Sequence, residues 1–393
     1  MGIKNLRQLI KKQCPDFETT LPLSFFSEKT VLIDAPLFIC VYKAKFKTPI
    51  KFKEAFTELF LAFKHAKVNI ILVIDGIAPV EKAPERLKRK ERKEQTAARL
   101  TQIKTDIKVY NDTSIPSPLL LQVHQKINLS PLEGINQEAP NPTPDPTTRR
   151  EAPDGDAFGI APQDMAPVVI SPILLKQHIK AIEEYIKKQE GHLFDISPED
   201  FKDVSEIGDL CGFSTIQAPG EAEIFCAGLI KTGVADAVLT RDTDVLACST
   251  PITIVDVNPR NQVATVIKMD NLLTSLKLTE KQMLDLCILC GTDYNDNIPR
   301  IGCIKAFELI HKYQSLENIE ALQDKKKDTK ILNYKAVRNL FSCDVEKFIL
   351  PVQQPLNVEG LSKYILDNQL AVSHTFKESF ELLTGKLDSI KIQ

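Results

Sequence analysis

Three short runs constrain the fold most, because each is mostly apolar and an acidic residue ends it or follows it closely. They are TVLIDA (30–35), NIILVIDG (69–76) and DAVLT (236–240). Continuous, β-branched apolar runs are typical of parallel strands that are covered on both faces. Amphipathic stretches separate the runs, and the clearest is FKEAFTELFLAFKHAK (52–67), whose phenylalanines recur at helical spacing. This alternation predicts an α/β fold with helices on both faces of a mostly parallel sheet.

The segment 111–172 has a different composition from the rest of the chain. It holds eleven of the 24 prolines, few aromatic residues and little periodicity. Such a composition predicts a disordered or extended insertion. A helix is expected to resume at Pro172 and to stop before Gly191, because proline favours the first helical position and glycine follows helix ends.

Acidic residues follow all three predicted strands. Asp34 and Asp75 end the first two, and Asp242 and Asp244 come just after the third. The carboxyl ends of parallel strands share one edge of a sheet, so these side chains should meet there. Helix capping would explain any single aspartate in such a place, but it explains three consecutive cases poorly.

Two further segments add carboxylates to this group. Glu221 and Glu223 open the predicted helix in PGEAEIFCAGLIKTG, and Asp293 follows an apolar helix in LCGTDYNDNIP. Ordinary first-turn glutamates are the simpler interpretation of the pair. Seven acids at one place would repel one another unless cations were bound. Hard divalent cations with oxygen ligands, Mg²⁺ or Mn²⁺, are therefore predicted, in a two-metal arrangement that suits phosphodiester cleavage.

Zinc is a poor fit to the sequence. None of the six histidines pairs with these motifs, and the one C-x-x-C, Cys287 to Cys290, lies in an apolar run that predicts core packing. The nine scattered cysteines suit a reducing compartment. No apolar run approaches the length of a membrane span, and no signal peptide is evident, so we expect a soluble, intracellular protein.

Basic residues gather in two places, although the net charge is only −2. Seven of the twelve residues from Lys82 to Lys93 are Lys or Arg, which alone favours a solvated helix with Glu–Lys pairs. Directly after a metal-binding strand end, a phosphate clamp is the better interpretation. In IPRIGCIKAFELIHKYQSLENI (298–319), a glycine turn enters a helix, as helix–hairpin–helix elements do to bind DNA phosphates.

Taken together, these motifs resemble the flap endonuclease/XPG family of structure-specific 5′ nucleases. The matching blocks are MGIKNL, VLIDA, ILVIDGIAPVEK with RLKRKERK, APGEAEIFCAGLIKTGVADAVLTRDTDVLA and LCILCGTDYNDNIPRIGCIKAFELI. The resemblance implies a PIN-like sheet with a helix–hairpin–helix region at 290–315. It also implies an N-terminal nuclease region (1–110), an insertion in the arch (111–172), an internal nuclease region (173–330) and a C-terminal helical tail (331–393).

The resemblance also implies roles for individual residues. The acids that would bind two Mg²⁺ ions are Asp34, Asp75, Glu221, Glu223, Asp242, Asp244 and Asp293. Lys82 and Arg89 match arch residues that stabilise the scissile phosphate. The expected DNA contacts are Gly2, Arg86, Arg92, Arg300, Gly302 and Lys305.

The chain departs from the family pattern in four places. The Pro-rich segment 111–172 replaces or extends the arch. Arg300 stands where the family's turn has its first glycine, so an arginine would contact phosphate there. The aromatic residue that stacks on the substrate falls at Cys40, and the nearby Tyr42 would point elsewhere. The C-terminal LTGKLDSIKIQ lacks a sliding-clamp-binding box.

The predicted function is metal-dependent hydrolysis of phosphodiesters at branched or flapped DNA, in replication, repair or recombination. A monomer is expected, located in the nucleus, or in the host nucleus if the chain is viral. Two alternatives remain: a 5′ nuclease of the same fold that acts on RNA, and a junction-binding protein without activity. The turn at 298–305 argues against the first, and the complete set of acids argues against the second.

Overall fold

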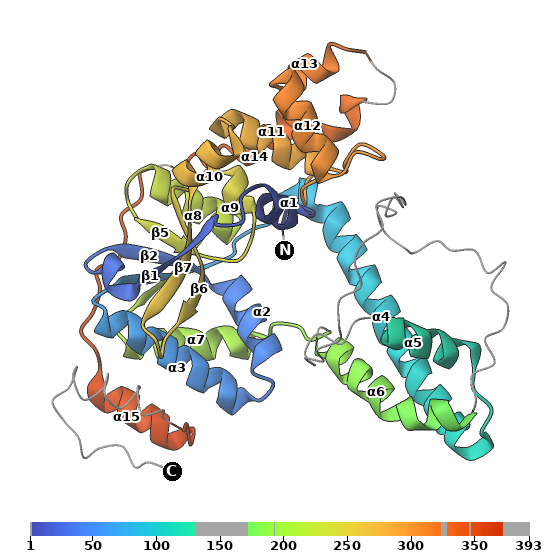
Figure 1. Ribbon diagram of the computed structural model, residues 1–393. Coiled ribbons are helices and arrows are strands. Elements are labelled where there is room, and N and C mark those ends of the chain that lie inside the picture. The colour runs from blue at the N-terminus through green and yellow to red at the C-terminus, as the bar shows by residue number, and fades with distance from the viewer. Residues whose placement is uncertain (1, 130–171, 192, 324–327, 346, 372–393) are drawn as a thin grey trace, which may run out of the picture. The chain divides into compact units, whose positions relative to one another are not determined.

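A mixed β-sheet lies at the centre of the fold (Figure 1). The structure is a computed structural model that describes residues 2–129, 172–191, 193–323, 328–345 and 347–371. Within these residues one sheet has seven strands in the order β1-β7-β6-β5-β2-β3-β4. The strands are β1 (Glu18–Pro22), β2 (Thr30–Asp34), β3 (Asn69–Ile74), β4 (Ser214–Gln217), β5 (Ala237–Leu239), β6 (Ile252–Asn258) and β7 (Val263–Lys268).

The strand directions confirm the expected α/β sheet. Strands β6, β5, β2, β3 and β4 run parallel to one another, whereas β7 pairs antiparallel with β6 and with β1 at one edge. The three apolar runs of the sequence form β2, β3 and β5, which are adjacent in the sheet. Their carboxyl ends therefore lie side by side, as the argument from parallel strands requires.

Side chains of β2 alternate between two apolar cores. Leu32 packs into one core, while Val31 and Ile33 pack into the other. Strands β3 and β5 alternate in the same way. Because both faces are covered, the strands are apolar throughout rather than at every second residue.

Helices cover both faces of the sheet (Figure 1). One face is covered by α2 (Ala35–Lys45), α3 (Pro49–His65), α7 (Pro198–Leu210) and α15 (Val358–Asp367). The predicted helix 52–67 lies within α3, which begins after the cap residue Thr48 and buries the phenylalanine stripe. The other core gathers α1 (Leu6–Gln13), α8 (Ala222–Lys231), α9 (Asp244–Ala247), α10 (Met269–Leu276), α11 (Glu280–Cys290), α12 (Cys303–Tyr313), α13 (Leu316–Glu320) and α14 (Tyr334–Leu340). Short 3₁₀ turns are η1 (Leu23–Phe26), η2 (Val80–Lys82) and η4 (Thr329–Leu332).

The C-terminal part of the described chain runs back along the sheet. The amide of Gln354 donates to the carbonyl of Gly212 (3.0 Å), and that of Asn357 donates to Leu210 (2.9 Å). Residues beyond 330 thus contribute to both cores, through α14 on one face and α15 on the other.

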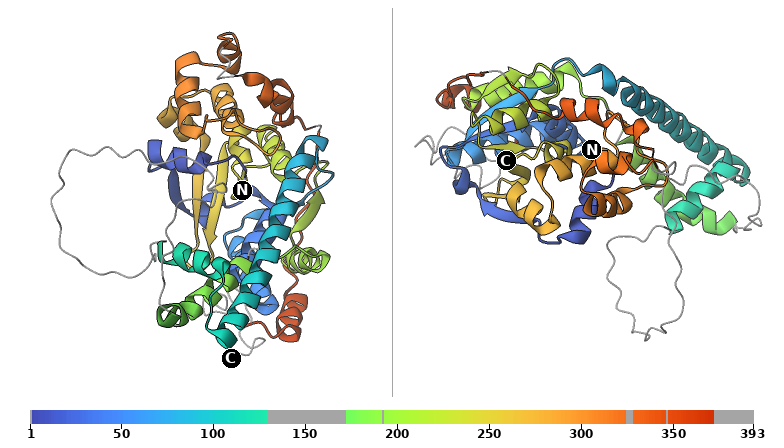
Figure 2. Two further views of the ribbon diagram at one scale, coloured as in Figure 1. Left: turned by 90° about the vertical axis from the view of Figure 1, so that its right-hand side faces the viewer. Right: turned by 90° about the horizontal axis from the view of Figure 1, so that it is seen from above.

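A second compact unit spans Glu91–Leu193, and the first comprises the residues up to Lys90 and from Phe194 onward. The elements of the second unit are the later part of α4 (Ala83–Thr113), α5 (Pro118–Leu129) and α6 (Pro172–Glu190). They share a small core, and Figure 2 shows α5 and α6 beside α4. The core residues are Leu100, Ile103, Ile107, Tyr110, Leu120, Val123, Ile182 and Ile186.

The predicted start of the disordered or extended insertion, residue 111, is too early, because the chain is helical over most of the next residues up to Leu129. Helix α4 continues to Thr113, and Pro118 starts α5 instead of breaking structure, because proline suits the first turn of a helix. Residues 130–171, the greater part of the expected insertion, lie outside the described residues. The predicted helix from Pro172 to Glu190 is confirmed as α6. No helix in the described ranges is both long and apolar enough to cross a membrane.

Candidate metal and nucleic-acid site

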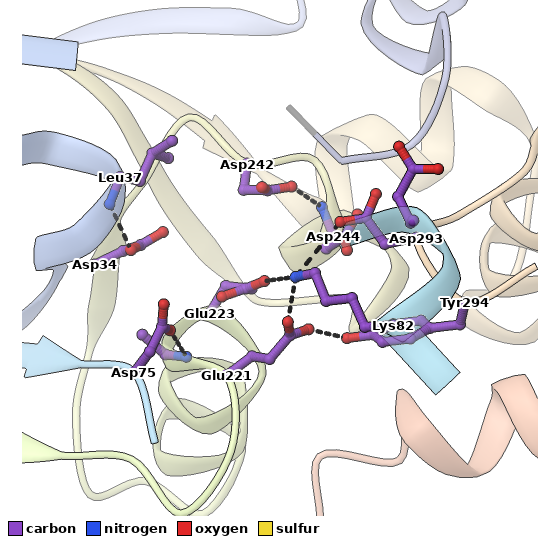
Figure 3. A network of polar contacts seen from close by, with 12 residues as sticks. Asp34, Leu37, Asp75, Lys82, Glu221, Glu223, Asp242, Asp244, Asp293 and Tyr294 are labelled. Carbon is purple, nitrogen blue, oxygen red and sulfur yellow. Dashed lines mark hydrogen bonds and ion pairs between the residues drawn. The ribbon is translucent and has the colours of Figure 1, made fainter. Parts of the chain in front are cut away.

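Strand ends and one helix start bring the predicted acids to one place (Figure 3). Asp34 is the last residue of β2 and caps α2, where its Oδ1 accepts from the amide of Leu37 (3.2 Å). Its Oδ2 accepts from the hydroxyl of Thr240 (2.8 Å). Asp75 follows β3 and accepts from the amide of Ala222 (2.9 Å) at the start of α8. These bonds fix two carboxylates toward the space between the strand ends.

The other acids reach the same space from α8, α9 and the segment after α11. Glu221 is the N-cap of α8 and Glu223 lies in its first turn. Asp242 follows β5, and its Oδ1 accepts from the amide of Asp244 (3.0 Å). Asp293 comes three residues after α11 ends. Figure 3 shows the seven carboxylates around one centre, which we call the acid cluster: Asp34, Asp75, Glu221, Glu223, Asp242, Asp244 and Asp293.

Burial makes the charges in the acid cluster costly. Asp34 is only 3% exposed and Asp244 1%. Burial raises the pKa of Asp34 to about 7, although its hydrogen bonds from Thr240 and Leu37 act the other way. Burial first, and neighbouring carboxylates second, raise the pKa of Glu223 and of Asp244 well above the usual range. A bound positive charge would relieve this cost.

Lys82 supplies one positive charge inside the acid cluster (Figure 3). Its ammonium forms an ion pair with Glu221 and lies 3.4 Å from Asp293 and 3.9 Å from Glu223. Burial opposes the charge on Lys82, but Glu223 and Glu221 outweigh that effect and raise its pKa. Arg89 adds a second contact, with its guanidinium 2.5 Å from Asp293. Both residues predicted to stabilise a scissile phosphate therefore face the acids.

The carboxylate of Asp244 is the clearest sign that a cation belongs here. Both of its oxygens are buried, and neither accepts a hydrogen bond. A buried charge without a partner is strongly unfavourable, so such groups are paired or bind metals. Within the described ranges, no group of three or more acid, histidine or cysteine side chains is arranged so that it could hold a metal ion as the side chains stand. The acids surround Lys82 instead, and their oxygens have the chemistry that Mg²⁺ and Mn²⁺ prefer.

Gly2 lies directly against the acid cluster. It has a φ of +82°, and a Cβ at this position would overlap Asp242 Oδ1 and lie 2.6 Å from both Asp244 Oδ1 and Thr243 Oγ1. The amide of Ile3 donates to Thr243 Oγ1 (2.8 Å), which anchors the start of the chain here. Only glycine combines this backbone conformation with so close an approach.

The sequence did not predict two residues that support the acid cluster, Tyr294 and Phe341. The hydroxyl of Tyr294 donates to Glu221, and the ring of Tyr294 packs against Phe341. Tyr294 directly follows the predicted metal ligand Asp293 in the sequence, and this adjacency could have indicated that Tyr294 lies near the acid cluster. Phe341 comes from a region without a recognisable motif, and only the fold brings it near.

Two predictions about neighbouring residues are confirmed. Tyr42 does lie elsewhere, in the core, where its ring contacts Phe38 and Phe56. Cys287 and Cys290 are buried core residues.

Comparisons with known proteins agree with this geometry. A sequence model of the XPG I-region matches residues 212–293, which include the acids from α8 to Asp293. A probable RAD2-like endonuclease, 076L, of Invertebrate iridescent virus 3 is 27% identical over 96% of this chain and 93% of its own length. Flap endonuclease 1 of Tetrahymena thermophila is 34% identical over 48% of this chain and 52% of its own. These matches support an XPG-type flap endonuclease family for this chain. Nucleases of this family generally depend on divalent metal ions.

The fold of this chain also occurs in a solved structure. The catalytic core of Rad2 in complex with DNA substrate has a TM-score of 0.57, with 15% identity over 97% of this chain and 99% of the Rad2 chain. The likeness at this identity concerns the fold, and it supports the PIN-like class predicted from sequence.

The expected DNA contacts lie in separate parts of the chain. Arg86 and Arg92 are exposed on α4, and Arg92 belongs to the second unit. Arg300 is exposed with φ +65°, a left-handed conformation that glycine adopts more easily than arginine. Lys305 donates to the carbonyl of Arg300 (3.3 Å), and Gly302 caps α12. Their contacts with DNA stay a prediction.

Proposed function

We propose that this chain is a Mg²⁺-dependent, structure-specific 5′ nuclease that hydrolyses phosphodiesters in branched or flapped DNA. The observation that carries the proposal is the buried carboxylate of Asp244, which has no hydrogen-bond donor inside a cluster of seven acids. A purely structural site would pair that charge, whereas a metal-dependent nuclease needs it available.

The seven acids divide into two groups that would each hold one ion. Glu221 and Glu223 lie at the start of α8, where Asp75 contacts the helix. Asp242, Asp244 and Asp293 lie around α9, and Asp34 ends the intervening strand β2. We propose two Mg²⁺ ions per chain, with Mn²⁺ as a substitute. Bound ions would act as Lewis acids on the attacking and leaving oxygens of the phosphodiester.

Lys82 and Arg89 would neutralise the scissile phosphate. Both already face Asp293, so a small side-chain movement would turn them from the carboxylate to a phosphate oxygen beside it. Preorganised cations of this kind stabilise the charge that develops during phosphoryl transfer. Gly2 would keep the backbone close enough for the substrate to lie against Asp242.

The turn at 298–305 would hold the duplex part of the substrate. Arg300 is exposed there, and the backbone amides at the start of α12 can donate to phosphate oxygens. Arg86, Arg92, Gly302 and Lys305 complete the proposed contacts. Rad2, whose fold this chain shares, was solved with a DNA substrate. A role in DNA replication, repair or recombination follows, with the chain acting as a monomer in a nucleus.

Cleavage of a 3′-labelled double-flap DNA tests the proposal. Wild-type protein is incubated with the flap, with single-stranded DNA or with single-stranded RNA, in Mg²⁺ or in EDTA, beside Asp244→Asn. The control is Asp256→Asn, which changes a half-exposed acid that is paired with Arg241 outside the acid cluster. We expect Mg²⁺-dependent cutting at the junction by wild type and the control, and a loss of at least about 1,000-fold in Asp244→Asn.

Other outcomes would favour the alternatives. Preferential cutting of single-stranded RNA would identify an RNA-directed nuclease of the same fold. Junction binding without cutting in any metal would identify a protein that only binds DNA. Unchanged cutting by Asp244→Asn would remove the assignment of Asp244 as a metal ligand.

A further inference from the structure

The two oxygens of Glu221 have different partners. Tyr294 donates its hydroxyl to Oε2, and the ammonium of Lys82 contacts Oε1 on the side of the acid cluster (Figure 3). We propose that Tyr294 is a positioning residue that fixes the carboxylate of Glu221, so that one oxygen alone faces the ion. This inference rests on the proposed function, because it concerns how that site holds its metal.

The position of Tyr294 is itself fixed from two sides. Its ring packs edge-on against Phe341, with centroids 5.3 Å apart and an interplanar angle of 74°. Phe341 is 2% exposed and directly follows α14, so it cannot move aside without disturbing the core. The backbone amide of Tyr294 donates to Thr292 Oγ1 (3.1 Å). The hydroxyl therefore reaches Glu221 from a rigid support.

Glu221 needs such a partner more than Asp75 and Asp242 do. The terminal torsion of a glutamate is broad, so its carboxylate can turn either oxygen, or both, toward a cation. Asp75 and Asp242 are short, and each is already held by a backbone amide. Within the described part of the chain, the Glu221 carboxylate contacts the hydroxyl of Tyr294 and the ammonium of Lys82. When substrate binds, Lys82 would turn from Glu221 to a phosphate oxygen, whereas the hydroxyl of Tyr294 would stay hydrogen-bonded to Glu221.

Donors that orient a metal ligand affect metal affinity directly. Groups that hydrogen-bond to ligating carboxylates typically change metal affinity or activity by 10- to 100-fold when they are removed. The contact between Phe341 and Tyr294 also gives the C-terminal region a part in the site, because Phe341 lies outside every motif that carries an acid. A Phe at position 294 would fill the same space and keep the contact with Phe341, but it would lose the oxygen.

Direct metal binding by Tyr294→Phe tests this inference without reference to cutting. Free Mn²⁺ is measured by electron paramagnetic resonance during titration of the full chain without DNA. The Mg²⁺ dependence of flap cutting is measured in parallel. The matched control is Tyr334→Phe, which removes a hydroxyl that donates to Glu320 (2.7 Å), a residue outside the acid cluster.

We expect Tyr294→Phe to weaken Mn²⁺ binding by about 10-fold or more and to raise the half-saturating Mg²⁺ concentration by a similar factor. The number of Mn²⁺ ions bound and the rate at saturating Mg²⁺ should stay near the wild-type values, because the ligands themselves remain. Tyr334→Phe should match wild type in both measurements. This separation of affinity from maximal rate would not arise from partial unfolding, which lowers the amount of active protein.

Two outcomes would overturn the inference. One is Mn²⁺ binding by Tyr294→Phe that equals wild type. The other is an equal loss in both tyrosine variants, which would indicate a general loss of packing in this part of the fold. If wild type cuts no nucleic acid but Tyr294→Phe still weakens Mn²⁺ binding, the positioning role stands and the proposed function fails.

Discussion

Lys82 forms an ion pair with Glu221 in the middle of the acid cluster, where the proposed metal ions would also lie. The chain therefore carries a cation of its own that offsets part of the repulsion among the carboxylates. The same ammonium is the group that we expect to face the scissile phosphate. Its two tasks, as a counter-charge before binding and as a phosphate contact afterwards, can be separated by mutation.

Lys82→Met is expected to lower the rate of flap cutting by about 100- to 1,000-fold, because a preorganised cation is lost. The half-saturating Mg²⁺ concentration should not rise, because no ligand is removed and a competing positive charge is gone. Initial rates over a series of Mg²⁺ concentrations would check both statements. A rise in the Mg²⁺ requirement with an unchanged maximal rate would contradict this role and make Lys82 part of the metal site.

Gly2→Ala is expected to destabilise the metal-free protein by about 1–3 kcal/mol and to lower cutting more than tenfold. The added methyl group would overlap Asp242, and alanine disfavours the φ of +82°. Thermal unfolding and flap cleavage measure the two effects. The matched change is Gly220→Ala, where the nearest atom to a new Cβ is the carbonyl oxygen of Ile77 at 3.8 Å. Equal stability of the two variants would show that the N-terminal segment can move away freely.

The arrangement of the acids could be predicted because it follows from local rules. Apolar runs of five to eight residues indicated buried parallel strands, and parallel strands carry their carboxyl ends to one edge. Asp34, Asp75 and Asp242 are placed by this rule alone. Glu221 and Glu223 followed from the start of a helix that the turn Pro219–Gly220 marks.

The parts that escaped prediction depend on contacts between distant segments. Phe341 reaches Tyr294 only because α14 packs into the same core as α11, and no periodicity records that. The sequence did not predict helix α5, because the nearby prolines indicate disorder by their number, whereas Pro118 starts the helix. The ion pair between Lys82 and Glu221 joins residues 139 positions apart, and neither segment alone indicates it.

Arg300→Gly is expected to stabilise the free protein by about 0.5–1 kcal/mol while it weakens duplex binding. Arg300 has φ +65°, a conformation in which a side chain costs energy and glycine does not. The same change removes an exposed guanidinium that we expect on a phosphate, so the salt dependence of binding should become shallower by about one unit. Denaturant unfolding and flap binding at several salt concentrations would show both effects. Unchanged binding would mean that the turn approaches DNA through its backbone alone.

The stability of the metal-free protein is expected to fall as the pH rises from about 4 to 7. Burial raises the pKa of Asp34 to about 7 in the folded state, whereas an unfolded aspartate has a pKa of about 3.9. Below pH 4 both states keep the proton, so this group's contribution is fully present. Between pH 4 and 7 only the unfolded state releases the proton, and the contribution is lost.

Asp34→Asn isolates this effect, because asparagine stays neutral throughout. In EDTA, the free energy of unfolding of wild type relative to Asp34→Asn should fall by about 1–3 kcal/mol between pH 4.5 and 7.5. Mg²⁺ should raise the free energy of unfolding of wild type more at pH 7.5 than at pH 5, because carboxylates bind metal when they are deprotonated. Denaturant unfolding over this pH range, with Mg²⁺ or EDTA, gives the comparison. A constant difference between the two proteins would show that Asp34 already carries its charge in the metal-free fold, with Thr240 and Leu37 as sufficient partners.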